Sequence, residues 1–401
     1  DELARVRADL SRQRERLSER EIRARADAVE ACLTLRCPPG WRGLPQLQSA
    51  LGATWRDLGQ WEKARDAYVA AIQADDRIGQ VPIRDIEQLA KVEAYLGEQR
   101  AEAELSGGPH SPAGESGMQL LDLALRRLKG LDALVSASLS ETGEPSEAEV
   151  IATIARAALR GGVYKRKASV AARRILLGGL SAAQQDQARD AMARALDDGV
   201  AAYASAEGHP GAGRFSPYLA LNRLALDALT DWPSPGDKDA SIALAQQCQQ
   251  RAVQGFARNP NLWDAVMQAD ALLIERLLDG SLGLPGEAGH ARFDELARAY
   301  DAVLSNISVK AIQIDAMVTQ MELLSRLCDA MSVTQQGNAT LSLMADRLLA
   351  LLQRLQPGHA PRDDRPVRAA ALSGVTAAAT ATRPARRAAA KADSKPAKRR
   401  R

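Results

Sequence analysis

Residues 44–76 read LPQLQSALGATWRDLGQWEKARDAYVAAIQADD. Apolar and small residues recur at helical spacing on both sides of Leu58-Gly59-Gln60, which predicts two amphipathic helices joined by a tight turn. Gly59 suits this turn because glycine has no Cβ and adopts left-handed backbone conformations at little cost. We therefore predict a helical hairpin over Pro45–Asp75 that turns at Gly59.

The small and large residues of this hairpin predict how its helices pack. Gly52 and Ala64 are small enough to let the two backbones approach closely. Trp55 and Tyr68 are large enough to fill the space against a neighbouring helix. We expect Ala64 and Tyr68 to be buried.

The rest of the sequence is also helical in pattern. Aromatic residues make up only 3% of the chain, and Ala, Leu, Arg, Glu and Gln, which favour helices, are abundant. No long stretch alternates apolar and polar residues, so no sheet is expected. A helix is predicted over Ile83–Glu98, and helical patterns resume from Met118 to about Gln356. Breaks are expected at Glu141–Pro145, Gly178–Leu180, Gly208–Gly213, Trp232–Asp237, Asn259–Pro260, Gly280–Gly289 and Gly337.

The spacing in residues 45–76 resembles the tetratricopeptide repeat, a 34-residue helical hairpin. The matching residues are the Leu51-Gly52 pair, the aromatic Trp55, the turn residue Gly59 and an Ala–aromatic–Ala triplet at positions 64, 68 and 71. Gln48 and Asp76 depart from the repeat, which has a large residue and a proline there. The resemblance implies an all-α, tetratricopeptide-like α-solenoid of helical hairpins that binds other proteins.

Two later segments also stand out. Residues 161–168, GGVYKRKA, place two glycines and Tyr164 before three consecutive cations. We expect the glycines to let a neighbouring helix approach and Tyr164 to fill the groove between the helices. The cations form either a basic patch for an acidic partner or a solvated helix face; they are Lys165–Lys167 with Arg160, Arg173 and Arg174. Residues 215–224, FSPYLALNRL, place Asn222 within an apolar stripe, where we expect its amide to bond a neighbouring backbone group.

Together these two segments resemble the regulatory helical region of the apoptosis signal-regulating kinases and its bacterial relatives, over roughly Glu147–Ala330. That region is a tetratricopeptide-like domain that binds TNF-receptor-associated factors. The resemblance implies a regulatory scaffold in a signalling or defence system, acting on a protein partner or on an attached effector domain such as a caspase-like protease. The Gly208–Gly213 insert and the C-terminal tail do not belong to this family pattern.

These patterns divide the chain into five parts. We predict a charged N-terminal helix over 1–40, a tetratricopeptide-like hairpin plus one helix over 41–98, a linker over 99–117, an irregular helical domain like the TRAF-binding region over 118–356, and a disordered basic tail over 357–401.

Charge is distributed unevenly along the chain. The formal net charge is +3, but the tail contains twelve Lys and Arg residues and only three Asp, so the preceding body is acidic. An acidic body argues against nucleic acid as the main ligand of the folded part. The alternative function is a nucleic-acid-associated protein that uses the tail as a cationic arm, and weak binding of this kind is expected from the tail itself.

No pattern of catalytic, cofactor-binding or metal-binding residues emerges. The sequence lacks HExxH, P-loop, GxSxG and GxGxxG motifs. The histidines lie in or beside loops rich in Gly and Pro, and the cysteines form no Cys-x-x-Cys pair; these residues are His110, His209, His290, His359, Cys32, Cys37, Cys248 and Cys328. We expect no enzyme activity and no cofactor.

The expected setting is cytoplasmic. The cysteines are expected to be reduced thiols, and no apolar run is long enough to cross a membrane. The chain begins inside a helical pattern without Met, which suggests a piece of a longer protein.

The preferred function from sequence is therefore non-enzymatic protein–protein interaction. The side chains expected to bind the partner are aromatic residues of the hairpins and the cations after Tyr164, namely Trp55, Tyr68, Tyr95, Tyr164, Lys165, Arg166 and Lys167.

Overall fold

A computed structural model describes residues 2–12, 18–76, 82–107, 115–142, 146–208, 216–230, 232, 238–306, 311–335 and 337–356. Within these ranges the chain forms helices and no strand, which confirms the all-α prediction. The predicted tail, residues 209–213 of the insert and three of the four histidines lie outside the described residues. Among the described helices, none combines the length and the apolarity that crossing a membrane requires.

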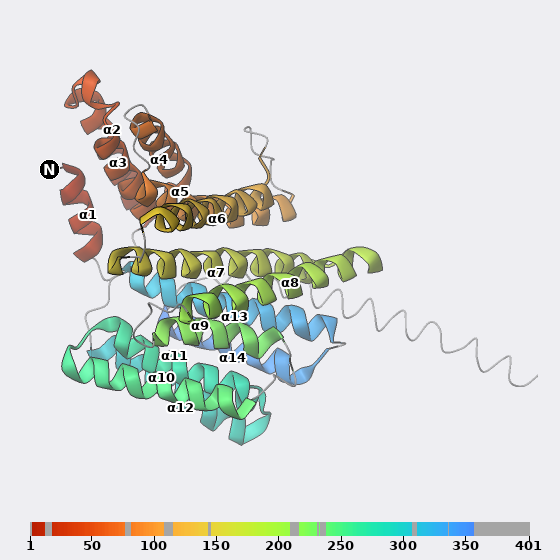
Figure 1. Cartoon of the computed structure of the whole chain (residues 1–401). Helices are drawn as coiled ribbons and strands as arrows, with labels where there is room; N and C mark the ends of the chain where they lie inside the picture. The colour runs from red at the N-terminus through yellow and green to blue at the C-terminus, as the bar shows by residue number, and fades with distance from the viewer. Residues whose placement is uncertain are drawn as a thin grey trace, which may run out of the picture.

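The α-helices follow one another with short connections (Figure 1). In chain order they are α1 (Glu2–Arg12), α2 (Glu19–Leu35), α3 (Pro45–Asp57), α4 (Trp61–Asp76), α5 (Ile83–Leu105), α6 (Gly117–Thr142), α7 (Glu147–Leu176), α8 (Ala182–Glu207), α9 (Pro217–Thr230), α10 (Lys238–Arg258), α11 (Leu262–Leu278), α12 (Gly286–Asn306), α13 (Ala311–Thr334) and α14 (Ala339–Leu355).

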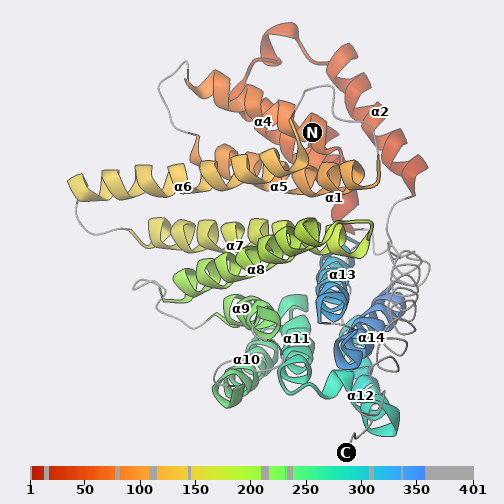
Figure 2. The same ribbon diagram turned by 90° about the vertical axis from the view of Figure 1, so that its right-hand side faces the viewer.

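The long helices α7 and α8 lie in the middle of the molecule. Helices α1–α6 lie on one side of them and α9–α14 on the other, as both views show (Figures 1 and 2). Helix α7 contacts α5 and α6 on the first side and α13 on the second. The pair α7/α8 therefore joins the two halves of the chain.

The hairpin predicted at Pro45–Asp75 is present as α3 and α4. Gly59, in the turn, has a φ of 70°, in the left-handed region that favours glycine. Ala64 and Tyr68 are 0% and 1% exposed, which confirms the expected burial. A Cβ built on Gly52 would lie 2.9 Å from the Tyr68 ring, so the missing side chain makes room for that ring.

The same packing recurs in the pair α7/α8. A Cβ on Gly161 would lie 2.6 Å from the Tyr203 ring. Tyr203 is flanked by Gly199 and Ala206, at the spacing of Ala64, Tyr68 and Ala71 in α4, and it is 1% exposed. The pair α5/α6 repeats the arrangement with Gly97 against Leu121, although this position carries no aromatic ring.

The N-terminal region differs from its prediction, because residues 1–40 contain two α-helices instead of one. Helix α2 begins after Ser18, whose hydroxyl accepts a hydrogen bond from the Glu21 backbone N–H while the Glu21 carboxylate accepts one from the Ser18 N–H. This reciprocal capping box starts a new helix.

The predicted linker over 99–117 also differs at its start. Helix α5 continues to Leu105 because Ala101, 2% exposed, packs where the backbone of Gly117 closely approaches it. This packing against α6 stabilises the last turns of α5, which lie in the range where a linker was predicted.

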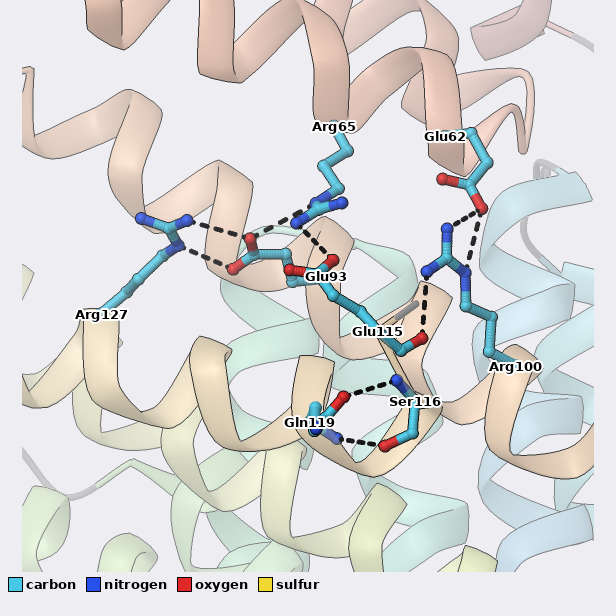
Figure 3. A network of polar contacts seen from close by, with 8 residues as sticks. All are labelled: Glu62, Arg65, Glu93, Arg100, Glu115, Ser116, Gln119 and Arg127. Atoms are coloured by element: carbon cyan, nitrogen blue, oxygen red, sulfur yellow. Dashed lines mark hydrogen bonds and ion pairs between the residues drawn. The ribbon is translucent and has the colours of Figure 1, made fainter. Parts of the chain in front are cut away.

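A buried ion cluster joins α4, α5 and α6 (Figure 3). Glu93 of α5 is 0% exposed and accepts hydrogen bonds from Arg127 of α6 at 2.8 and 3.2 Å. The Nε of Arg65, from α4, lies 3.6 Å from the same carboxylate. Burial raises the pKa of Glu93, while the two guanidinium groups act in the opposite direction. The paired cations thus offset part of the desolvation of a carboxylate between three helices.

Candidate functional site: an apolar groove with a cationic end

A groove of about 720 Å³ lies between α5 and α6 on one side and α7, α8 and the start of α9 on the other. Its position is set by the packing of α7 on both α5 and α8. A groove of this size with mostly apolar walls and a few polar groups is typical of a binding site.

The first turns of α7 form the apolar part of the groove. Helix α7 starts with a capping box, in which Ser146 and Glu149 exchange hydrogen bonds between side chain and backbone. Ile151, Ile154 and Ala158 then follow at steps of three and four residues, so they share one face of the helix. Ile151 is 59% exposed, so its side chain is open to solvent beside the half-buried Ile154.

A cation and aromatic rings form the other part of the groove. The Tyr95 ring stacks on Trp61 with centroids 4.7 Å apart, and the Arg166 guanidinium lies 3.8 Å from the Tyr95 centroid. Arg166 also lies 3.3 Å from Glu98. Tyr203 and Tyr218 line the same groove, and Tyr218 is 54% exposed. Arg166 is therefore held in place by an aromatic face while the groove stays open beside it.

Lys91 adds a second cation one turn before Tyr95 on α5. Burial lowers the pKa of its ammonium group. Within the described part of the chain Lys91 has no hydrogen bond or ion pair, although it lines the groove.

The acidic residues of the groove already have partners. Glu87 lies 3.1 Å from Arg156, and Glu207 lies 2.9 Å from Arg223. The uncompensated charge of the groove is therefore positive and is carried by Lys91.

The structure distributes the predicted partner-binding residues among several places. Tyr95 and Arg166 meet in the groove. Trp55 and Tyr68 are 4% and 1% exposed, because they fill the space within and beside the hairpin α3/α4 and do not line the groove. Tyr164 is 8% exposed and belongs to the core between α5, α6, α7 and α8.

The three consecutive cations after Tyr164 do not share one surface, because successive helical residues point about 100° apart. Lys165 donates hydrogen bonds to Asn222 Oδ1 at 2.7 Å and Gln320 Oε1 at 2.6 Å, between α7, α9 and α13. Lys167 lies 2.9 Å from Asp122, beside a second cavity of about 500 Å³. A single basic patch over residues 165–167 therefore does not form.

The Lys165 contacts belong to a polar cluster in the interior. Burial lowers the pKa of Lys165 to about 7 and raises that of Asp270 to about 6. Asp270 accepts a short hydrogen bond from Tyr300, which is 0% exposed. Asn222 also donates to the Tyr218 backbone carbonyl at 2.8 Å, which confirms the expected backbone bond.

Sequence reasoning missed three residues of the groove. Lys91 lies outside the main apolar stripe of α5. Its spacing of four residues from Tyr95 places the two side chains on the same, second face of the helix. Ile151 was not singled out in the sequence. Tyr218 was noted only as part of a structural segment. In each case the helix face was visible in the sequence, whereas its exposure was not.

Other reactive side chains do not gather at a site in the described part of the chain. All four cysteines are free, and Cys248 and Cys328 are buried. Burial raises the pKa of the Cys248 thiol to about 12, so it is un-ionised near neutral pH. His290 is exposed on α12, and the described residues contain no cluster of three metal-ligating side chains.

No protein-family model, curated protein or solved structure matches this chain.

Proposed function

We propose that this chain is a non-enzymatic interaction module that binds a protein partner, or an attached effector domain, in the groove between α5 and α7. The observation that carries the proposal is the 59% exposure of Ile151 in a groove whose opposite part presents Arg166 on the Tyr95 ring. An exposed apolar wall beside a desolvated cation is typical of a binding surface.

A tetratricopeptide-like solenoid is the architecture that we propose for this module. Support comes from the repeated contact of a glycine with a large side chain, Gly52 with Tyr68, Gly97 with Leu121 and Gly161 with Tyr203. Successive hairpins with the same internal contact are expected of a repeat protein, in which each unit packs on its neighbours. In this proposal the module regulates the partner protein or the attached effector domain by binding it in the groove.

Affinity capture with the full chain tests the proposal. Ile151→Asp places a charge on the apolar wall of the groove. Val253→Asp is the matched control, because Val253 is 49% exposed on α10, which does not line the groove. We expect a discrete protein to be retained by the parent and by Val253→Asp and lost by Ile151→Asp. Equal capture by all three chains would contradict the proposal.

A further inference from the structure

The dimensions of the groove indicate the size of its occupant. Its lining follows α7 from Ile151 to Arg166, a distance of about 22 Å at 1.5 Å per helical residue. This length corresponds to roughly four turns of a bound helix. Helices that bind in grooves of this kind insert side chains at i, i+3, i+4 and i+7.

The two ends of the groove differ in chemistry. At the end nearer the start of α7, Ile151, Ile154 and Ala158 offer aliphatic surface. At the other end, Arg166 lies on Tyr95, and Lys91 lies one turn earlier on α5. An occupant must therefore be apolar over one part of its length and complementary to a cation over the other.

The charge favours a carboxylate at the cationic end. Lys91 has no ion-pair partner among the described residues, and Arg166 has only Glu98 at 3.3 Å. An acidic side chain placed between Lys91 and Arg166 would gain charge-assisted hydrogen bonds in a partly desolvated site. The chain's own tail is a poor candidate, because its twelve cations would meet two more.

We infer that the groove binds an amphipathic helix of a partner protein, with aliphatic side chains over Ile151–Ala158 and an Asp or Glu side chain at Lys91 and Arg166. This inference rests on the proposed function and specifies its ligand. A fatty acid shares the apolar and carboxylate chemistry, but it needs an enclosed cavity for its chain. The 59% and 54% exposure of Ile151 and Tyr218 leaves this groove open, which suits a helix that covers it.

Selection from a displayed library of random 16-residue peptides on the full chain tests the inference. We expect the selected peptides to share an apolar stripe at helical spacing and one Asp or Glu toward one end. Fluorescence anisotropy then measures binding of one selected peptide and of its analogue with Lys in place of the acid.

Charge reversal at Lys91 provides the decisive comparison. Lys91→Glu should weaken the acidic peptide on the order of tenfold, because attraction becomes repulsion in a partly desolvated groove, and should strengthen binding of the Lys analogue. Lys129→Glu, an exposed cation on α6 outside the groove, is the control and should leave both affinities unchanged.

The remaining outcomes separate the inference from the proposed function. If selected peptides bind the parent but not Ile151→Asp, and Lys91→Glu has no effect, the carboxylate assignment is wrong while the groove function stands. If Ile151→Asp binds them as well as the parent, both fail. If no peptide is selected, the helix is not the ligand, and the capture experiment with Ile151→Asp decides the groove function. If a fluorescent fatty acid occupies the groove and displaces the peptides at lower concentration, the helix is not the ligand.

Discussion

The hairpins α3/α4 and α7/α8 are packed in the same way but differ in length. In both, a glycine of the first helix faces a buried tyrosine of the second, Gly52 with Tyr68 and Gly161 with Tyr203. The first pair has helices of 13 and 16 residues, and the second has helices of 30 and 26. Helix α7 has 14 residues before Gly161 where α3 has seven before Gly52, and the added residues include Ile151 of the apolar wall. The contact between the helices thus sets the packing, while the extra length adds Ile151 to the surface proposed to bind a partner.

The largest effect expected from this comparison follows removal of the two tyrosine rings. Tyr68→Ala and Tyr203→Ala should each lower the free energy of unfolding by about 3–5 kcal/mol, because each leaves a ring-sized cavity beside a glycine. Urea unfolding of each variant measures this. A loss below about 1 kcal/mol in either hairpin would show that the two contacts are not equivalent.

Neighbouring glycines of α7 give a sharper test. Gly161→Ala should lower the free energy of unfolding by about 1–3 kcal/mol, because its Cβ would lie 2.6 Å from the Tyr203 ring. Gly162→Ala should instead raise it by about 0.5–1 kcal/mol, because the nearest atom to that Cβ is an Arg166 nitrogen at 3.9 Å and alanine favours helices. Equal effects at both positions, measured by urea unfolding, would contradict the assigned contact.

A pH-dependent effect concerns Lys165, whose hydrogen bonds join α7 to α9 and α13. Its pKa is about 7 in the folded chain, below the ordinary value of 10.5, so between these values the folded state binds fewer protons than the unfolded state. The free energy of unfolding should therefore rise with pH across this window, by at most about 1.4 kcal/mol per pH unit. The cost of burying the charged form is present in full below pH 7.

Urea unfolding of the parent and of Lys165→Met at pH 7, 8 and 9 checks this expectation. Lys165→Met should lose the rise with pH. Lys167→Met is the control, because Lys167 is ion-paired with Asp122 at 2.9 Å, and it should keep the rise. The same pH dependence in all three chains would show that Lys165 does not titrate in this range.

The sequence predicted the hairpin α3/α4 because its helices are short and its small and large residues fall at the spacing of a known repeat. The equivalent contact of Gly161 with Tyr203 was not predicted. The longer helices place these two residues farther apart in the sequence than the tetratricopeptide spacing, so the repeat pattern is not recognisable there. The break between α1 and α2 was missed for another reason. Its signal was the Ser18–Glu21 capping box, which is visible in the sequence but weak beside the apolar periodicity.

The groove was predicted only in part. Tyr95 and Arg166 stood out in the sequence as an aromatic residue and a cation, and the structure brings them to 3.8 Å. Their meeting depends on how α5 packs on α7, which local pattern does not determine. The same holds for Ile151. The sequence pattern of an apolar stripe on α7 is the same whether a neighbouring helix covers the stripe or leaves it exposed.

Site-specific crosslinking tests most directly whether the added turns of α7 hold the partner. A photo-reactive amino acid is placed at Ile151 and, in a second chain, at Val253 on α10, and both chains are illuminated with the captured protein. We predict a crosslink from position 151 to an apolar helical segment of the partner and none from position 253. Crosslinks of equal yield from both positions, or from position 253 alone, would contradict the assignment of the groove as the binding site.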